Sequence, residues 1–313
     1  MENKTALVTG GSGYLGSVLS KKLKSEGWTV ICLDIKKPKH SYYDWYWDYD
    51  ITDCNLVDIV FRESQKIDVV FHLAGRIEVG ESMKNPTKFW EVNTGGTCIL
   101  LNAMKKYGID KIVYSSTAGV YKAVDYKILE CDELANNHVY GNSKYAAECA
   151  IRDSGLKYVI FRYFNLAGAE DDVGENHEPE THLIPSILQN LNSFQLYGND
   201  FDTKDGTCVR DYVHVSDVAD AHILAINYLS EGGESETFNL GTGEGHSNQE
   251  IMTLITKLFP VTITYDILPR RQGDPDQLVA DITFARKVLN YRPKHDIISI
   301  LKSAYEWNEK NGK

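Results

Sequence analysis

The sequence predicts an α/β protein, with a doubly wound parallel sheet in its first half and a smaller C-terminal α/β lobe. Short apolar runs alternate with helical patterns from Thr5 to Arg162, and such runs are typical of strands buried on both faces of a parallel sheet. Past about Asn165 the alternation is less regular, and the 313 residues can fill one large domain or two. We expect one domain over 1–164, with 209–241 packing back on it, and a second lobe over 165–313.

The first predicted strand, Thr5–Thr9, runs into a glycine-rich turn and then a helix that begins at Tyr14. Glycines at positions 10, 13 and 16 match G-x-x-G-x-x-G. Glycines let a backbone approach a pyrophosphate, and the N–H groups and dipole at a helix N-terminus stabilise its charge. This order of strand, turn and helix predicts a Rossmann-type nucleotide site.

The second predicted strand, over 29–33, ends at Asp34. An acidic residue about twenty positions after such a glycine turn can accept hydrogen bonds from the adenosine ribose. Lys36 and Lys37 offer an alternative, a site for the 2′-phosphate of NADP, but the Asp34 carboxylate would repel that phosphate. We therefore predict NAD as the cofactor.

The rest of the first half continues the alternation. The aromatic and acidic stretch 42–50 is expected to be a surface connection, with Asp50 and Ile51 returning to the nucleotide. Gly95 and Gly96 lie inside a long predicted helix and indicate close approach of a neighbouring segment. The predicted helices are 55–65, 86–107 and 140–153, and the predicted strands are 68–73, 112–115 and 157–162.

The second half shows shorter elements. A polar loop is expected over 170–180, and apolar positions on one face predict a last helix from Ile297 onward. Between them we expect helices over 184–191, over 218–229 and after Ser247, strands over 195–197, 237–240 and 262–265, and a loop over 270–274.

Composition excludes several classes of function. The net charge of −11 argues against nucleic acid as a partner and requires local arginines for any anionic ligand. Six cysteines without C-x-x-C spacing indicate buried thiols in a reducing compartment, and nine histidines without H-x-H or H-x-x-x-H spacing predict no metal site. With no long apolar run and no room for a signal peptide before Thr5, we expect no membrane partner and a cytoplasmic location.

Tyr140 and Lys144 are the candidate catalytic pair, because positions i and i+4 share one helix face. A nearby ammonium favours the phenolate of a tyrosine whose ordinary pKa is about 10, which makes it a general base or acid near neutral pH. Thr117, just past a strand end, can hold a sugar hydroxyl together with Tyr140. A second Y-x-x-x-K match, Tyr107 to Lys111, straddles a predicted helix end and strand start, so its side chains need not meet.

Together these motifs resemble the extended short-chain dehydrogenase/reductase family and, within it, the UDP-glucose 4-epimerases, along nearly the whole chain. The match over 205–215 is the most specific. The other matching stretches are 74–75, 79–82, 115–117, 120–121, 162–165, 198–200, 239–241 and 269–274.

The resemblance implies interconversion of UDP-glucose and UDP-galactose by a hydride relay. Tyr140 would take the proton of the sugar 4-hydroxyl while a hydride passes from C4 to tightly held NAD. The 4-keto sugar would then turn and receive the hydride on its other face. Thr117 would hydrogen-bond that hydroxyl, and Lys144 would also hold the nicotinamide ribose. A homodimer formed through two helices of the first domain is implied as well.

The resemblance also assigns binding residues. Arg210 and Arg271 would supply the positive potential for a diphosphate. The implied cofactor contacts are Gly10, Gly13, Tyr14, Leu15, Gly16, Asp34, Asp50, Ile51, Leu73, Ala74, Gly75, Asn93, Ser115, Tyr163 and Phe164. The implied UDP-sugar contacts are Asn165, His182, Leu183, Tyr197, Arg210, Arg271, Asp274 and Leu278.

The chain departs from the family pattern at several positions. The connection from 34 to 50 is short, Ile77 stands where a cofactor-binding lysine is usual, with Arg76 beside it, His182 replaces an asparagine, and Lys122 replaces a glycine. Leu278 stands where a tyrosine in some members excludes N-acetylated sugars and a small residue in others admits them. We hypothesise some activity on UDP-N-acetylhexosamines.

Two other readings stay open from the sequence. A sugar-nucleotide 4,6-dehydratase or decarboxylase shares the fold and the Y-x-x-x-K pair, but that group carries an acidic residue just after the strand-end Ser or Thr. Ala118 and Gly119 follow Thr117. A non-catalytic NAD-binding sensor usually lacks the tyrosine and the lysine, and both are present.

Overall fold

The computed structural model describes residues 4–311 except 65, 136–137, 179 and 272. The first three residues, the predicted helix end at Gln65 and Gln272 in the loop 270–274 therefore lie outside the described residues.

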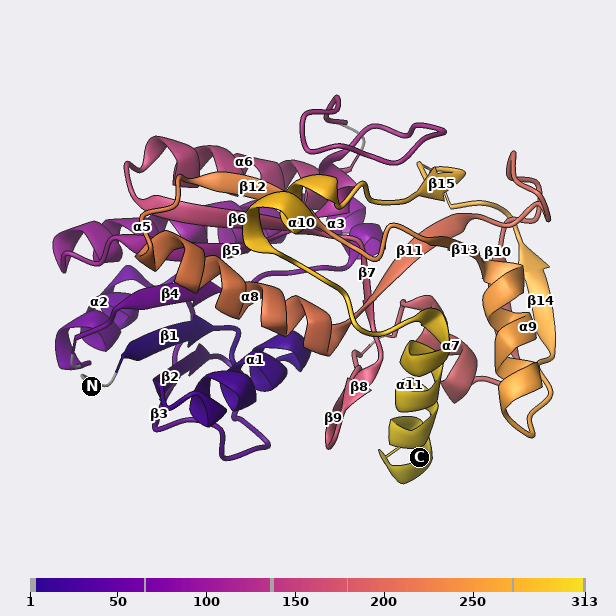
Figure 1. Ribbon diagram of the computed structural model, residues 1–313, viewed down its shortest axis with the longest axis horizontal. Coiled ribbons are helices and arrows are strands. Elements are labelled where there is room, and N and C mark those ends of the chain that lie inside the picture. The colour runs from indigo at the N-terminus through magenta and orange to yellow at the C-terminus, as the bar shows by residue number, and fades with distance from the viewer. Residues whose placement is uncertain (1–3, 65, 136–137, 179, 272, 312–313) are drawn as a thin grey trace.

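A seven-stranded sheet forms the centre of the first half, and neighbouring strands are parallel throughout. The order reverses beside β1, the middle of the classic doubly wound arrangement. The prediction of this fold is confirmed (Figure 1). In spatial order the strands are β12 (Glu236–Leu240), β6 (Lys157–Tyr163), β5 (Lys111–Thr117), β4 (Val69–His72), β1 (Thr5–Thr9), β2 (Thr29–Asp34) and β3 (Trp45–Asp48).

Helices cover both faces of this sheet, because successive side chains of a buried strand point to opposite sides. In β1, Ala6 and Val8 join the core on one face and Leu7 joins the core on the other. The first core includes residues of α1 (Tyr14–Ser25) and α8 (Val215–Ser230). The second core includes residues of α2 (Cys54–Glu63), α5 (Thr97–Lys106) and α6 (Val139–Asp153).

The expected surface connection over 42–50 is wrong, since β3 is an edge strand that pairs with β2. Without β3, the edge of β2 would present unpaired backbone groups, and aromatic residues such as those of β3 suit a half-buried strand. Trp47 packs on the core, whereas Trp45 is 63% exposed.

The long helix predicted over 86–107 is divided into three parts. A π-helical segment, η1 (Trp90–Gly96), lies between α4 (Pro86–Phe89) and α5. A Cβ on Gly96 would lie 2.6 Å from Ile51 Cδ1, which confirms the expected close approach. The expectation is wrong for Gly95, where an added Cβ would meet its nearest neighbour at 3.7 Å. An unpredicted short helix, α3 (Val79–Lys84), precedes this region.

The second half of the chain builds smaller sheets around a third core. The predicted strand over 262–265 begins later, at β14 (Tyr265–Leu268), which pairs with β10 (Phe194–Tyr197). The expected polar loop begins with a hairpin of β8 (Ala169–Glu170) and β9 (Val173–Gly174). The other strands are β7 (Asn165–Ala167), β11 (Val209–His214), β13 (Gly245–Ser247) and β15 (Gln277–Leu278), and the helices are α7 (Leu183–Gln189), α9 (Asn248–Leu258), α10 (Thr283–Leu289) and α11 (Ile297–Asn311).

The segment 209–241 contributes to both halves of the molecule. Its first strand, β11, pairs with β7, β13 and β15 in the C-terminal half, whereas β12 completes the large sheet beside β6. The division of the chain into two domains at 164 stays a prediction. Among the described residues, no helix combines the length and the apolar character needed to cross a bilayer.

Candidate functional site

The glycine turn lies between β1 and α1, at the carboxyl edge of the sheet. Gly10 adopts φ +69°, a left-handed conformation that favours glycine, and a Cβ there would lie 2.7 Å from Ala74 N. A Cβ on Gly16 would lie 2.2 Å from Gly10 O. Because Gly13 at the helix start has no capping side chain, the first N–H groups of α1 are free to bind an anion.

Asp34 lies beside this turn at the end of β2. Its Oδ2 accepts from Ser12 N at 3.0 Å, and its Oδ1 accepts from Lys36 N at 2.8 Å. Burial raises the pKa of its carboxyl above the ordinary value, while these backbone hydrogen bonds act in the opposite direction. The glycine turn and Asp34 together fit an adenosine diphosphate. The glycines let the backbone come close to the diphosphate, and the Asp34 carboxylate can accept hydrogen bonds from the ribose.

Sequence analysis missed Tyr43, which covers the glycine turn and donates its hydroxyl to Gly11 O. The signal was its place in the short aromatic connection between β2 and β3. Of the expected contacts from that connection, Ile51 is buried against Gly96, and Asp50 Oδ1 accepts from Thr52 N at 2.9 Å. The Asp50 carboxylate therefore hydrogen-bonds within the turn that it starts, to Thr52.

Asn93 in η1 ties together two segments at the same edge. Its side-chain oxygen accepts from Arg76 N at 2.8 Å, and its Nδ2 donates to Arg76 O at 3.1 Å and to Ser143 Oγ at 3.0 Å. The chain just after β4, with Leu73, Ala74 and Gly75, is thereby fixed against α6.

Lys144 on α6 is a buried lysine. It is 5% exposed, and its Nζ lies 4.4 Å from the centre of the Tyr114 ring. Burial lowers the pKa of Lys144 from its usual value to about 7, against the attraction of Glu148. A Cβ on Gly75 would lie 3.6 Å from Nζ, so the lysine reaches the edge where Asn93 holds the chain.

Tyr140 and Thr117 meet at this edge. Contrary to the expected lowering, burial raises the pKa of the Tyr140 phenol, and a hydrogen bond with the Thr117 side chain acts against that rise. Tyr140 N also donates to Ser82 Oγ at 3.2 Å, which joins α6 to α3. Tyr140 is thus paired with Thr117, and Lys144 lies one helical turn further along α6.

A buried polar chain, also missed by sequence analysis, lies next to this trio. Ser115 Oγ is 2.7 Å from Tyr163 OH, which is 2.8 Å from His222 Nε2 on α8. Tyr163 and Ser115 were expected to contact the cofactor, whereas His222 carried no local signal because it comes from a distant helix. Phe164, one residue past β6, is buried.

Glu148 anchors α6 to the sheet. Its carboxylate accepts from Arg162 Nε at 3.0 Å and Nη2 at 2.7 Å, and from the hydroxyl of Ser116. Arg162 Nη1 in turn donates to Tyr121 OH at 2.8 Å. These contacts fix α6 against β5 and β6, and hence the position of Lys144 one turn earlier.

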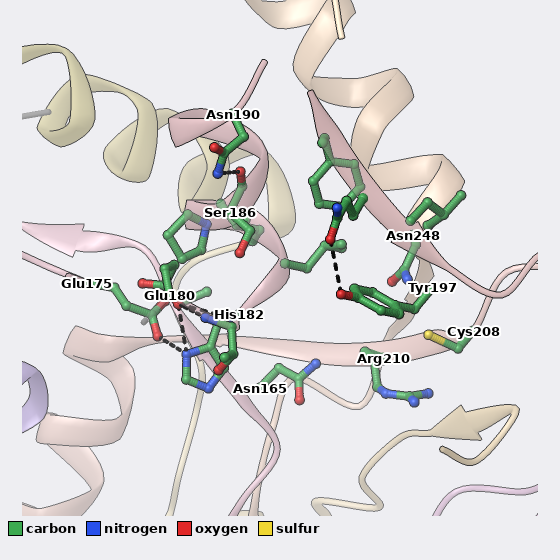
Figure 2. Close-up of a pocket in the computed structure, with 18 of the residues that line it drawn as sticks. Asn165, Glu175, Glu180, His182, Ser186, Asn190, Tyr197, Cys208, Arg210 and Asn248 are labelled. Atoms are coloured by element: carbon green, nitrogen blue, oxygen red, sulfur yellow. Dashed lines mark hydrogen bonds and ion pairs between the residues drawn. The ribbon is translucent and has the colours of Figure 1, made fainter. Parts of the chain in front are cut away.

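A cavity of ≈ 480 Å³ lies in the C-terminal half, beyond the end of β6. Seven of the eight expected UDP-sugar residues line it, namely Asn165, His182, Leu183, Tyr197, Arg210, Arg271 and Asp274. The eighth, Leu278, is absent from the lining and is partly buried in β15, opposite Arg210 of β11. Figure 2 shows the cavity with Arg210 and Tyr197 on one side and His182 on the other.

Both expected arginines hold defined positions at the cavity. Arg210 Nη1 donates to Pro275 O at 2.9 Å, and its Nη2 lies 3.8 Å from Asp274 Oδ1. The Arg271 guanidinium lies 4.1 Å from the centre of the Tyr197 ring. Two guanidinium groups at one cavity, with Arg271 stacked on the Tyr197 ring, suit a ligand that joins a diphosphate to an aromatic base.

His182 lies among acidic groups at the other side. Its Nδ1 is 2.7 Å from Glu175 Oε1 and 3.5 Å from Glu180 Oε1. Burial lowers the pKa of this imidazole, but attraction and hydrogen bonding from Glu175 outweigh burial and raise the pKa to about 10.

The other departures from the family pattern lie at the surface, with Ile77 36% exposed and Lys122 paired with Glu133 at 2.9 Å.

Comparisons with known proteins agree with this geometry. The model of the NAD dependent epimerase/dehydratase family matches residues 6–241. A UDP-glucose 4-epimerase of Lacticaseibacillus casei is 43% identical, over 97% of this chain and 97% of its own. Among solved structures, the UDP-glucose 4-epimerase from Brucella ovis in complex with NAD has a TM-score of 0.91 and 34% identity, covering 97% of this chain and 98% of that one.

A further solved structure is that of UDP-glucose 4-epimerase from Bifidobacterium longum in complex with NAD+ and UDP. It has a TM-score of 0.92 and 33% identity, and it covers 98% of this chain and 99% of its own. The chain therefore belongs to the NAD dependent epimerase/dehydratase family.

Proposed function

We propose that this protein is a UDP-glucose 4-epimerase, which interconverts UDP-glucose and UDP-galactose through a 4-keto intermediate and uses NAD. The observation that carries the proposal is the pairing of Tyr140 with Thr117, with buried Lys144 one helical turn further along α6. The edge also holds the glycine turn, and the cavity begins at Asn165, just past β6.

The residues at this edge fit NAD. The turn of Gly10, Gly13 and Gly16 would hold the diphosphate, Asp34 would accept from the adenosine ribose, and Lys144 would donate to the nicotinamide ribose. When bound, NAD would take a hydride from C4 of the hexose and return it to the opposite face of the 4-keto sugar.

Tyr140 is proposed to remove the proton from the sugar 4-hydroxyl and to give it back to the new 4-hydroxyl. Thr117 would donate to or accept from the same oxygen and keep it near the phenol. The ammonium of Lys144, when charged, favours the phenolate and so lowers the cost of proton removal.

The cavity is proposed to bind the UDP moiety. Arg210 and Arg271 give local positive charge in a chain whose net charge is −11, and Tyr197 adds an aromatic ring beside Arg271. Asn165, Leu183 and Asp274 would complete the contacts along the wall. Such a site holds the nucleotide while the hexose is left free to turn.

An assay with UDP-galactose tests the proposed reaction. We expect UDP-glucose as the product, separated by chromatography, with an equilibrium reached from either sugar. A 4,6-dehydrated or decarboxylated product would overturn the proposal, and so would the absence of turnover by a protein that binds NAD.

Assembly and location extend the proposal. We infer a cytoplasmic homodimer that associates through α5 and α6, which is supported by exposed aromatic residues near these helices, Trp90 at 41% and Tyr145 at 37%. Sedimentation should give twice the chain mass, and Tyr145→Glu should shift the protein to monomer. A wild-type monomer at micromolar concentration would contradict the inferred dimer.

A further inference from the structure

A second group of polar side chains lies on the loop between β9 and α7, at the wall of the cavity. Glu175, His177, Glu180 and His182 each bring one N or O atom to a common centre, and these atoms lie within 4.8 Å of one another. All four come from eight consecutive residues. The two histidines are five positions apart and so form neither an H-x-H nor an H-x-x-x-H motif.

The four donors have the separations of a compact metal site. His182 Nδ1 is 2.7 Å from Glu175 Oε1, and His177 Nδ1 is 3.5 Å from Glu175 Oε1 and 3.9 Å from Glu180 Oε2. Ligands of a tetrahedral zinc ion, each at about 2.0–2.2 Å from the metal, lie about 3.3 Å apart. The three observed separations lie on both sides of this value.

The cluster also buries two carboxylates. The side chains of Glu175 and Glu180 are 7% and 6% exposed. Within the described part of the chain, both carboxylates form their ion pairs with the imidazoles of His177 and His182. When a divalent cation replaces the proton of His182, both imidazoles are neutral and the two charges of the cation match those of the two buried carboxylates.

Two further observations indicate that the donors are already placed. The Glu180 carboxylate accepts from the backbone N–H groups of Thr181 at 2.8 Å, His182 at 2.9 Å and His177 at 3.3 Å, which fixes its direction. His177 Nδ1 is buried and has no hydrogen-bond partner among the described residues, although it faces both carboxylates. Figure 2 shows Glu175, Glu180 and His182 turned toward one another.

We propose that Glu175, His177, Glu180 and His182 bind a divalent cation of the zinc class. Two nitrogen and two oxygen donors in a tetrahedral arrangement suit Zn²⁺ better than Mg²⁺ or Ca²⁺, which prefer six or more oxygen ligands. The ion would fix the loop 175–182 at the cavity wall. The site is separate from Tyr140 and Lys144, and it does not depend on the proposed reaction.

Zinc content measures this site directly. The full-length protein is dialysed against a Zn²⁺ buffer, and the bound metal is counted by mass spectrometry for wild type, His177→Ala, Glu180→Gln and His246→Ala. His246 is the matched control, because it also pairs with a glutamate, Glu250, but lies outside the cluster. The expectation of buried thiols is wrong for Cys54, Cys98 and Cys131, which are exposed, and these thiols give every variant the same background.

We expect wild type and His246→Ala to hold one more zinc ion per chain than the two cluster variants. The affinity of the cluster variants should fall by more than the about 10–100-fold that the loss of an outer ligand partner costs. Circular dichroism shows that each variant is folded. Equal zinc content in wild type and both cluster variants would overturn the proposal and leave a buried ion-pair cluster only.

Cobalt gives a second, spectroscopic reading of the same site. Co²⁺ bound to wild type should show the visible bands of a tetrahedral site without thiolate charge-transfer absorption, and His177→Ala should remove those bands. A thiolate spectrum, or bands that persist in His177→Ala, would place the metal elsewhere and contradict the assignment.

Discussion

Tyr140 is the residue on which the proposed chemistry depends most directly. Its phenol meets Thr117 and shares a helix face with Lys144. Replacement by phenylalanine removes the acid and base and keeps the ring, so Tyr140→Phe should lower kcat by about 10²–10⁴-fold with little change in KM. The rate is measured with UDP-galactose.

Tyr107→Phe is the matched control, because it alters the other Y-x-x-x-K match. Tyr107 donates to Asp58 at 3.0 Å at the amino-terminal side of β5, away from the site. Its rate should stay near that of wild type. Near-full activity of Tyr140→Phe would reject Tyr140 as the base.

Lys144 should leave a signature in the pH dependence of stability. The folded protein lowers its pKa to about 7, so between pH 7 and the ordinary lysine pKa the unfolded chain holds a proton that the folded chain has lost. Stability from this group is therefore lowest below pH 7 and rises with pH. The free energy of unfolding of wild type relative to Lys144→Met should rise by about 1.4 kcal/mol per pH unit above 7.

Urea unfolding at pH 6, 7, 8 and 9, without added nucleotide, measures this difference. Lys111→Met serves as the control, since that lysine pairs with Asp110 at the surface, at 2.9 Å. A constant difference between wild type and Lys144→Met from pH 6 to 9 would show that Lys144 keeps an ordinary pKa.

Variants of Leu278 test whether the protein accepts N-acetylated UDP-sugars. The side chain is partly buried in β15, opposite Arg210. If it sets the room for an N-acetyl group, Leu278→Tyr should lower the ratio of UDP-N-acetylglucosamine to UDP-glucose turnover, and Leu278→Ala should raise it. An unchanged ratio in Leu278→Tyr would dismiss the hypothesis of activity on acetylated sugars.

Among the elements, η1 shows how local geometry serves the site. The π-helical segment places Asn93 where its amide satisfies the backbone of Arg76 and the hydroxyl of Ser143. Asn93→Ala removes the side-chain partner of the backbone N–H and C=O of Arg76, while Ser143 Oγ keeps its hydrogen bond to Tyr140 O at 2.8 Å. We expect it to lower the free energy of unfolding by about 1–3 kcal/mol.

Asn190→Ala is the control, because Asn190 is exposed and donates to Ser186 O at 3.0 Å. It should change the free energy by less than about 0.5 kcal/mol. Urea unfolding of both variants gives the comparison. Equal, small losses would mean that Asn93 is not the tie between the strand end and α6.

Sequence periodicity was sufficient for elements with strong local signals and failed where tertiary contacts decide. α1, α6 and α8 were predicted because their apolar faces and end signals are continuous. The edge strand β3 was not, since its pairing depends on the free edge of β2, and η1 was not, since Gly96 adapts to Ile51 from another segment.

The same limit applies to the candidate site. Tyr140, Lys144 and Thr117 follow from spacing and strand ends, whereas Tyr43 and His222 reach the site from segments whose place the sequence does not specify. The mixed cluster of histidines and glutamates likewise appears only when the loop after β9 is folded.

For the whole molecule, charge gives a further prediction. A chain with net charge −11 that binds an anionic nucleotide depends on Arg210 and Arg271 at its cavity. UDP at 100 times its Kd should raise the free energy of unfolding by about 2.7 kcal/mol. At the same UDP concentration, Arg271→Leu should lose most of this gain. A full gain in that variant would exclude Arg271 from UDP binding.

The central claim, inversion at C4 with internal return of the hydride, is tested most directly with UDP-galactose that carries deuterium at C4. The proposed mechanism predicts UDP-glucose that keeps deuterium at C4 when the reaction runs in ordinary water. Product without deuterium, or deuterium found at another carbon, would contradict it.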